Sequence, residues 1–205
     1  MNPVIIGVDV SSTRTGVAWA YGSSSQQYCG PTQELSPSDW AWRMIEMADF
    51  VLDKAKSVGA TMAIVEELPS GSLKYDKTRT VCERCGLYWR VICSLQEAGI
   101  KCYLVSPTSL KKFMTGDGRA EKPQIEREIR RLFPFCLPNN HDEADAKALC
   151  VIGYRWHSVS ICEETESQAR FCPSPPWECS KKEKKPNRTS KKRQSKTSPK
   201  FKNGC

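Results

Sequence analysis

The sequence lacks any apolar run close to the roughly 20 residues that a membrane-spanning helix needs, so we expect no membrane segment. Its start has no basic stretch followed by an apolar stretch and a small-residue cleavage site, which argues against secretion. It also contains no internal repeat. These absences favour a cytoplasmic location, which would be the cytoplasm of the host cell if the protein is viral.

Net positive charge is confined to one end of the chain. Residues 181–205 hold eleven Lys or Arg against one Glu, whereas the whole chain has a formal net charge of +8, so the first 180 residues sum to −2. The apolar periodicity ends near residue 158, and prolines precede the lysine-rich run. We predict one domain over residues 1–157 and a disordered tail over residues 158–205. Such a tail is typical of a nonspecific phosphate-binding arm, although a lysine run also fits a nuclear-localisation signal.

Cysteine is abundant, with eleven residues, but several of them fall in apolar helical or strand patterns. This placement favours reduced thiols over a secreted disulfide framework. Cys82 and Cys85 form a C-x-x-C pair, and Cys172 with Cys179 could in principle complete a zinc site. The second pair has the wrong spacing, so packing cysteines are the better interpretation.

Strand and helix signals alternate along the chain. Ser36-Pro37 and Ser106-Pro107 each place an N-cap residue before a proline at the first helical position. The pattern predicts a mixed α/β fold with one central sheet of about five strands flanked by helices. The expected strands lie near residues 4–10, 17–20, 24–30, 61–65 and 102–105, and the helices near 36–59, 80–98, 106–114, 121–132 and 140–156.

Asp9 interrupts the first of these strands, which is otherwise apolar and rich in valine and isoleucine. A carboxylate in a buried strand is costly unless a hydrogen-bond network, a counter-charge or a metal compensates it. Asp9 is therefore the strongest single candidate for a functional residue.

Three further acids occupy positions from which they could converge on Asp9. Glu66 follows the strand near residues 61–65, where acids of α/β folds meet ligands. Asp142 and Asp145 are three residues apart in the first turn of a helix and therefore share a face. Four carboxylates with no thiolate set nearby favour Mg²⁺, with Mn²⁺ as a substitute. Two such ions could bind the attacking water and the leaving oxygen of a phosphodiester. Taken singly, Glu66 and Asp142 also fit an ordinary strand end and an ordinary helix start.

The blocks that carry these acids resemble the RuvC family of Holliday-junction resolvases. They occur in that family's order and at similar intervals over about residues 1–157. The resemblance implies an RNase H-like fold with Asp9, Glu66, Asp142 and Asp145 as catalytic, metal-binding acids. It also implies a homodimer that cuts two strands of a four-way DNA junction symmetrically. The matching blocks are Gly7-Val8-Asp9, Thr15-Gly16, Ile64-Val65-Glu66, the run Gly116-Asp117-Gly118-Arg119-Ala120-Glu121-Lys122, and Asp142-Glu143-Ala144-Asp145-Ala146.

Basic residues carry over from the same resemblance. Lys111 and Lys122 match positions where the family keeps basic residues near the scissile phosphate, and Arg119 and Lys112 lie beside them. We expect all four to contact DNA, although a solvated helix surface is the competing interpretation for Lys112.

The sequence departs from the family's pattern after Glu66. An aromatic residue that stacks on a base at the junction centre is expected about three positions later, where this chain has Pro69. Tyr75, further along the same segment, is the candidate substitute for DNA contact.

Three interpretations of function remain open at this point. The first is a Mg²⁺-dependent endonuclease that cleaves branched DNA, including flaps and forks. The second is another RNase H-like nuclease, such as a YqgF-type enzyme acting on RNA, and the third is a junction-binding protein without catalysis. The glycine-rich segment before Lys122 favours the first over the second, and the four intact acids argue against the third. His141 fits either a proton shuttle or a surface histidine.

Overall fold

A five-stranded sheet with the order β3-β2-β1-β4-β5 forms the centre of the molecule. The computed structural model describes residues 3–28, 35–68 and 78–175. β1, β2 and β3 pair antiparallel, whereas β4 and β5 run parallel to β1. The predicted mixed sheet of five strands is thereby confirmed. The strands are β1 (Ile5–Asp9), β2 (Arg14–Trp19), β3 (Gly22–Gln27), β4 (Met62–Glu66) and β5 (Lys101–Val105).

The helices begin where the capping signals place them. Ser36 caps α1 by accepting a hydrogen bond from the Asp39 N–H, and Ser106 caps α3 by accepting one from the Ser109 N–H. Gly59 and Gly99, which follow α1 and α2, have positive φ angles that favour glycine. The helices are α1 (Pro37–Ser57), α2 (Thr78–Glu97), α3 (Pro107–Thr115), α4 (Lys122–Leu132), α5 (His141–Trp156) and α6 (Glu166–Arg170).

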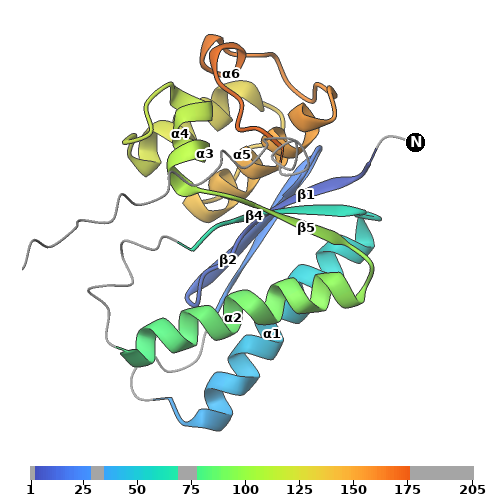
Figure 1. The fold of residues 1–205 in the computed structure, drawn as a ribbon, viewed down its shortest axis with the longest axis vertical. Helices are drawn as coiled ribbons and strands as arrows, with labels where there is room; N and C mark the ends of the chain where they lie inside the picture. The colour runs from blue at the N-terminus through green and yellow to red at the C-terminus, as the bar shows by residue number, and fades with distance from the viewer. Residues whose placement is uncertain (1–2, 29–34, 69–77, 176–205) are drawn as a thin grey trace, which may run out of the picture.

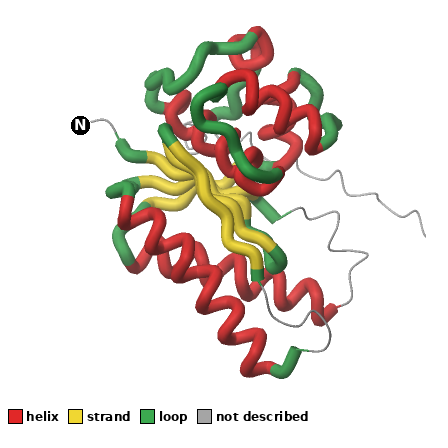
Figure 2. The backbone as a smooth tube through the Cα atoms, turned by 180° about the vertical axis from the view of Figure 1, so that it is seen from behind, coloured by secondary structure: helices red, strands yellow, loops and turns green. Residues whose placement is uncertain are grey.

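Helices cover both faces of the sheet (Figures 1 and 2). α1 and α2 pack on one face, where alternate residues of β1 and β4 such as Ile6 and Val65 complete an apolar cluster. α5 packs on the other face, with α3, α4 and α6 around it, and Ile5 and Ile64 join that cluster. Because α5 lies between the sheet and these smaller helices, its residues are buried continuously from Glu143 to Tyr154. No helix of the described residues is long and apolar enough to cross a membrane.

The packed region extends past residue 157, where the sequence analysis ends the domain. Ile161 and Phe171 pack against the core cluster beside α5, and α6 lies between them in the chain. The indole Nε1 of Trp156 also donates to the Pro173 carbonyl oxygen at 2.6 Å. The boundary expected at 157 is therefore too early for this segment, which packs without a regular apolar period. The lysine-rich run lies outside the described residues.

The cysteines considered as zinc ligands lie far apart in the fold. Cys82 is exposed on α2, whereas Cys172 packs against the core cluster on the opposite face of the sheet. Cys179 lies outside the described residues. Cys102 and Cys150 pack into the two apolar clusters as expected, but Cys93 is exposed on α2.

Candidate active site

Asp9 and Glu66 lie side by side at the ends of neighbouring strands. The parallel register pairs Val8 with Val65, so the next residue on each strand is one of the two acids. Side chains alternate between the faces of a sheet, and both acids follow the series that includes Ile5 and Ile64. Both therefore point to the α5 side of the sheet.

Two glycines allow α5 to lie directly on β1 and β2. A Cβ atom at Gly7 would be 1.9 Å from the Ala146 carbonyl oxygen, and one at Gly16 would be 2.3 Å from the Asp142 carbonyl oxygen. Neither distance is possible for a real side chain, so glycine is required at both positions. This close approach of two backbones brings the first turn of α5, with Asp142 and Asp145, to the end of β1 that carries Asp9.

The electrostatics of the four acids show that they form one group. Burial is the main cause that raises the pKa of Asp9 well above its usual value, and Glu66, Asp145 and Asp142 raise it further. Burial, followed by the charge of Asp145, raises the pKa of Glu66 to about 7. Burial also raises the pKa of Asp145. Asp142 and Asp145 therefore act electrostatically on Asp9, and Asp145 also acts on Glu66.

Lys122, at the start of α4, lies against the two acids of α5. Its Nζ is 3.4 Å from Asp145 Oδ2 and 3.9 Å from Asp142 Oδ1. Burial acts to lower the pKa of Lys122, but Asp145, Asp9 and Asp142 outweigh it and raise the pKa. Lys122 also opposes the upward pKa shifts of Asp9, Glu66 and Asp145. It therefore compensates part of the negative charge of the site.

A pocket of about 280 Å³ opens over these residues. Its lining combines three of the four acids, Asp9, Glu66 and Asp142, with two basic residues. These are Lys122 and Arg84, and Arg84 comes from α2, the helix on the face of the sheet opposite α5. The sequence gives no sign of a role for Arg84, because only the fold brings α2 to this pocket. The lining residues are Asp9, Val10, Ser11, Ser12, Glu66, Glu67, Leu68, Arg84, Leu87, Lys122 and Asp142.

The other residues that the sequence predicts to contact DNA do not lie together in one place. Lys111 is close enough to Glu66 to oppose the rise of its pKa. Lys112 instead lies over the Phe171 ring, with Nζ 4.5 Å from the ring centroid. Arg119 is exposed in the segment before α4, where its backbone N–H donates to Asp117 Oδ1. Tyr75 lies outside the described residues, as does Pro69.

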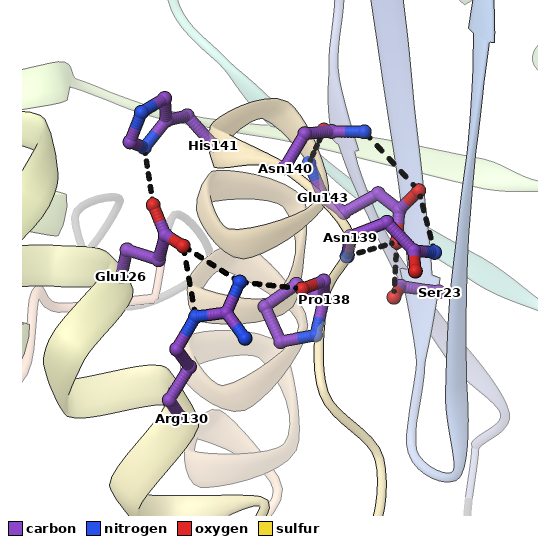
Figure 3. Close-up of polar contacts among 8 residues, drawn as sticks. All are labelled: Ser23, Glu126, Arg130, Pro138, Asn139, Asn140, His141 and Glu143. Carbon is purple, nitrogen blue, oxygen red and sulfur yellow. Dashed lines mark hydrogen bonds and ion pairs between the residues drawn. The ribbon is translucent and has the colours of Figure 1, made fainter.

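Glu143 is a buried acid that the sequence analysis quoted only as part of a block. It is 2% exposed and lies between Asp142 and Asp145 in the chain. Its carboxylate accepts hydrogen bonds from Ser23 and Ser25 of β3 and from Asn139 (Figure 3). In the sequence, Glu143 stands three residues after Asn140, the N-cap of α5. A glutamate is common at this position of a helix, so its place in the first turn was the feature that could have drawn attention to it.

His141, in the first turn of α5, contacts Glu126 of α4 (Figure 3). Its Nδ1 is 2.6 Å from Glu126 Oε2, and Glu126 also pairs with Arg130, whose guanidinium donates to the Pro138 carbonyl oxygen. This chain of contacts joins α4 to the start of α5. Within the described ranges, no three His, Cys, Asp or Glu side chains form a ready-made metal shell.

The strand order and the acids at the strand ends define an RNase H-like fold, and solved structures agree. Thermus thermophilus RuvC in complex with a Holliday junction substrate superposes with a TM-score of 0.57 at 22% identity, covering 78% of this chain and 99% of that chain. Another structure of Thermus thermophilus RuvC gives a TM-score of 0.55 at 20% identity, with the same two shares covered.

Sequence relatives identify the family. The crossover junction endodeoxyribonuclease RuvC of Azorhizobium caulinodans is 32% identical over 155 residues, which is 72% of this chain and 86% of the relative. The enzyme of the same name from Ruegeria pomeroyi is 23% identical over 172 residues, which is 80% of this chain and 99% of the relative. A scan against protein-family models finds no match. The chain belongs to the RuvC family.

Proposed function

We propose that this protein is a Mg²⁺-dependent endonuclease that cleaves four-way DNA junctions and related branched DNA by hydrolysing phosphodiesters. The observation that carries the proposal is the group formed by Asp9, Glu66, Asp142 and Asp145, in which burial and mutual repulsion raise the pKa values of Asp9 and Glu66. Membership of a family whose relatives are named crossover junction endodeoxyribonucleases supplies the substrate and the reaction.

The donor atoms of this group fit a hard divalent cation. All four side chains offer carboxylate oxygens, which suit Mg²⁺ or Mn²⁺. Burial, followed by the charges of Glu66 and Asp145, raises the pKa of Asp9 in spite of the opposing charge of Lys122, so a bound cation would stabilise the ionised carboxylates. We assign Asp9, Glu66, Asp142 and Asp145 as the residues that would hold the metal. When bound, it would activate water and stabilise charge on the phosphate.

The basic residues have a separate role in this proposal. Lys122 already contacts Asp142 and Asp145, and Lys111 acts on Glu66 from α3, so both cations flank the carboxylates. A phosphodiester brought to the pocket would meet these ammonium groups, which would balance its charge and hold it against the acids. Arg119, exposed before α4, and Lys112 are assigned to the DNA surface around the pocket.

Cleavage of a four-way junction requires two cuts of the same kind. A homodimer with two-fold symmetry presents two equivalent sites, and we assign that state to this protein on its family membership. The lysine-rich run over residues 181–205 is assigned to nonspecific contact with phosphates. It holds eleven Lys or Arg and one Glu, whereas the first 180 residues sum to a net charge of −2.

A cleavage assay tests the proposal directly. Four-way junction, flap, duplex and RNA–DNA hybrid substrates are incubated with the protein in Mg²⁺ or in EDTA. We expect cleavage of the junction in Mg²⁺ and none in EDTA. Preferred cleavage of an RNA-containing substrate would contradict the proposal, as would cleavage that persists in EDTA.

The variant Asp9→Asn identifies the site in the same assay. It removes one negative charge with little change in volume, so the protein should still bind the junction through its cations. Cleavage should fall by at least about a thousandfold, in line with the loss of a group that is essential to the chemistry. Cleavage at the wild-type rate would show that the site is wrongly assigned.

A further inference from the structure

We propose that Glu143 is a positioning residue that sets the orientation of Asp142 and Asp145 by anchoring the first turn of α5 to the edge strand β3. The proposal rests on the proposed function, because it assumes that Asp142 and Asp145 hold the metal. Glu143 itself touches neither the metal nor the substrate in this assignment, and it acts through the helix that carries it.

The Glu143 carboxylate is surrounded by hydrogen-bond donors. Ser23 Oγ donates to Oε2 at 2.8 Å, and Ser25 Oγ donates to Oε1 at 2.9 Å. The Asn139 N–H and Nδ2 each donate to Oε2 at 3.1 Å, and Asn140 Nδ2 lies 3.4 Å from Oε1 (Figure 3). These donors come from β3, about 120 residues earlier, and from the segment that precedes α5. The side chain therefore ties three parts of the chain together at one point.

This anchor lies on a different side of α5 from the two acids that it would orient. At about 100° per residue, Asp142 and Asp145 lie roughly 60° apart around the helix, whereas Glu143 lies about 100° from Asp142 and roughly 160° from Asp145. Side chains reach about 6 Å from the helix axis, so a 20° rotation of this turn would move the carboxylates by about 2 Å. A metal site does not tolerate such a shift, since its ligand distances vary by only a few tenths of an ångström.

A carboxylate is the group that these surroundings select. Ionised carboxylates only accept hydrogen bonds, and the backbone N–H and the two asparagine amides around Glu143 can only donate from the atoms that face it. Glutamine has nearly the same shape but would turn an NH₂ group toward these donors. Glu143→Gln should therefore break the anchor with a minimal change in volume.

Contacts on the other flank do not replace this anchor. His141 contacts Glu126 of α4, and both side chains are partly exposed to solvent. That contact joins α5 to another helix, whereas Glu143 joins it to the sheet that carries Asp9. The glycine contacts at Gly7 and Gly16 fix how closely α5 approaches the sheet, and the Glu143 anchor then opposes rotation of its first turn relative to Asp9.

The test compares Glu143→Gln with Lys147→Met, a matched change of a buried charged residue on the same helix. Lys147 is 1% exposed and donates to the carbonyl oxygens of Trp19 and Ala20, and no contact to the acids of the site involves it. For each full-length variant, we measure the melting temperature, Mn²⁺ affinity by calorimetry without DNA, and the Mg²⁺ concentration that gives half-maximal junction cleavage.

We expect Glu143→Gln to weaken Mn²⁺ binding by about 10-fold or more, the usual effect of losing a residue that orients a metal ligand. Its half-maximal Mg²⁺ concentration should rise in parallel, and high Mg²⁺ should restore much of the cleavage. Lys147→Met should lower the melting temperature but change Mn²⁺ affinity by less than about 2-fold. Wild-type Mn²⁺ affinity in Glu143→Gln would overturn the proposal and leave Glu143 a purely structural role.

The double variant Ser23→Ala, Ser25→Ala keeps the test decisive if Glu143→Gln does not fold. It removes the two donors on β3, and with Ser25 also an acceptor of Asn140 Nδ2, but keeps the donors from Asn139 to Glu143, so Mn²⁺ binding should weaken while the protein stays folded. Unchanged Mn²⁺ affinity in this variant would overturn the proposal. Failure of the wild-type protein to cut junctions would instead contradict the proposed function, and the Mn²⁺ comparison would still decide the role of Glu143.

Discussion

Both faces of the sheet are packed by an apolar cluster, but the α5 face adds a backbone-to-backbone contact and buried, hydrogen-bonded charges. On the α1 and α2 face, an apolar cluster that includes Met47 and Val51 fills the space, and the buried Arg43 stacks on Tyr28 with 3.9 Å from Cζ to the ring centroid. On the α5 face, two backbones meet at Gly7, and the buried charges of Glu143 and Lys147 are fully engaged in hydrogen bonds. The candidate active site is on the second face.

The difference has a physical reason. Apolar burial is non-directional, so α1 and α2 can shift slightly and keep most of their stabilisation. Hydrogen bonds depend on distance and angle, and a glycine contact between backbones permits only one separation. Glu143 shows the effect at the start of α5, since its carboxylate accepts from Ser23 Oγ at 2.8 Å and from Ser25 Oγ at 2.9 Å. A face that must place carboxylates accurately is built from the more restrictive contacts.

Substitution of glycine gives the strongest contrast between the faces. In Gly7→Ala the new Cβ would lie 1.9 Å from the Ala146 carbonyl oxygen, so α5 must move off the sheet. We expect a loss of at least about 4 kcal/mol in the free energy of unfolding, or no folded protein at all. Urea denaturation followed by circular dichroism measures this.

Gly86→Ala on α2 is the control for that substitution. Its new Cβ would lie 3.1 Å from Met44 Sδ, the end of a flexible side chain that can move. The higher helix propensity of alanine should offset the contact, leaving stability within about 1 kcal/mol of the wild type. If both variants were equally stable, the contact between α5 and the sheet would be no stricter than ordinary packing.

Removal of apolar volume from the α1 face should affect stability and leave the site intact. Val51 is fully buried in the cluster of α1 and α2. Val51→Ala should lower the free energy of unfolding by about 2 kcal/mol through lost burial and a small cavity. Junction cleavage per folded molecule should stay at the wild-type rate. A tenfold loss of cleavage at equal folded fraction would mean that both faces position the carboxylates.

The sequence predicted those features that local chemistry determines. Ser36 and Ser106 signal their helix starts within a few residues, and the structure places both as N-caps. The order of strand and helix signals along the chain predicted a single mixed sheet, and the unusual acid in its first strand indicated where the candidate site lies. Asp9 was recognisable because an ionisable group in an apolar strand needs a compensating partner.

Features that depend on distant partners could not be predicted in the same way. The role of Glu143 requires Ser23 and Ser25, whose strand lies beside it only in the folded chain. Arg84 lines the pocket because the first half of α2 lies beside it, and the spacing of Arg84 on the helix gives no sign of this. Phe171 packs on the core through tertiary contacts without any apolar period, so the end of the packed region was placed too early.

The charge of the site should make stability depend on pH in the absence of divalent ions. The pKa of Glu66 rises from 4.5 to about 7 on folding, and that of Asp9 also rises. Between these values the folded protein binds more protons than the unfolded chain, so stability falls as pH rises from about 5 to 8. This loss of stability at higher pH offsets part of the stabilisation that the contacts of the α5 face provide.

Glu66→Gln tests that dependence. In EDTA at pH 8 it should be more stable than the wild type by about 1–3 kcal/mol, and its melting temperature should change less between pH 5 and pH 8. Mg²⁺ at pH 8 should raise the melting temperature of the wild type more than that of the variant. A wild-type pH profile in Glu66→Gln would show that this carboxylate is not destabilised by its surroundings.

The smallest expected effect concerns Lys122, which opposes the upward pKa shifts of Asp9, Glu66 and Asp145. Without its charge these pKa values should rise further, so the fall in stability of Lys122→Gln should extend to higher pH. Because its side chain is 55% exposed, solvent screens the interaction and the effect should stay below about 1 kcal/mol. Melting curves in EDTA at several pH values measure it, and added salt should shrink the difference.

Lys112→Gln is the matched control, since that lysine lies over Phe171 and should leave the profile unchanged. Equal pH profiles for the two variants would mean that Lys122 does not compensate the carboxylates in solution, and the charge of the α5 face would then be balanced from elsewhere.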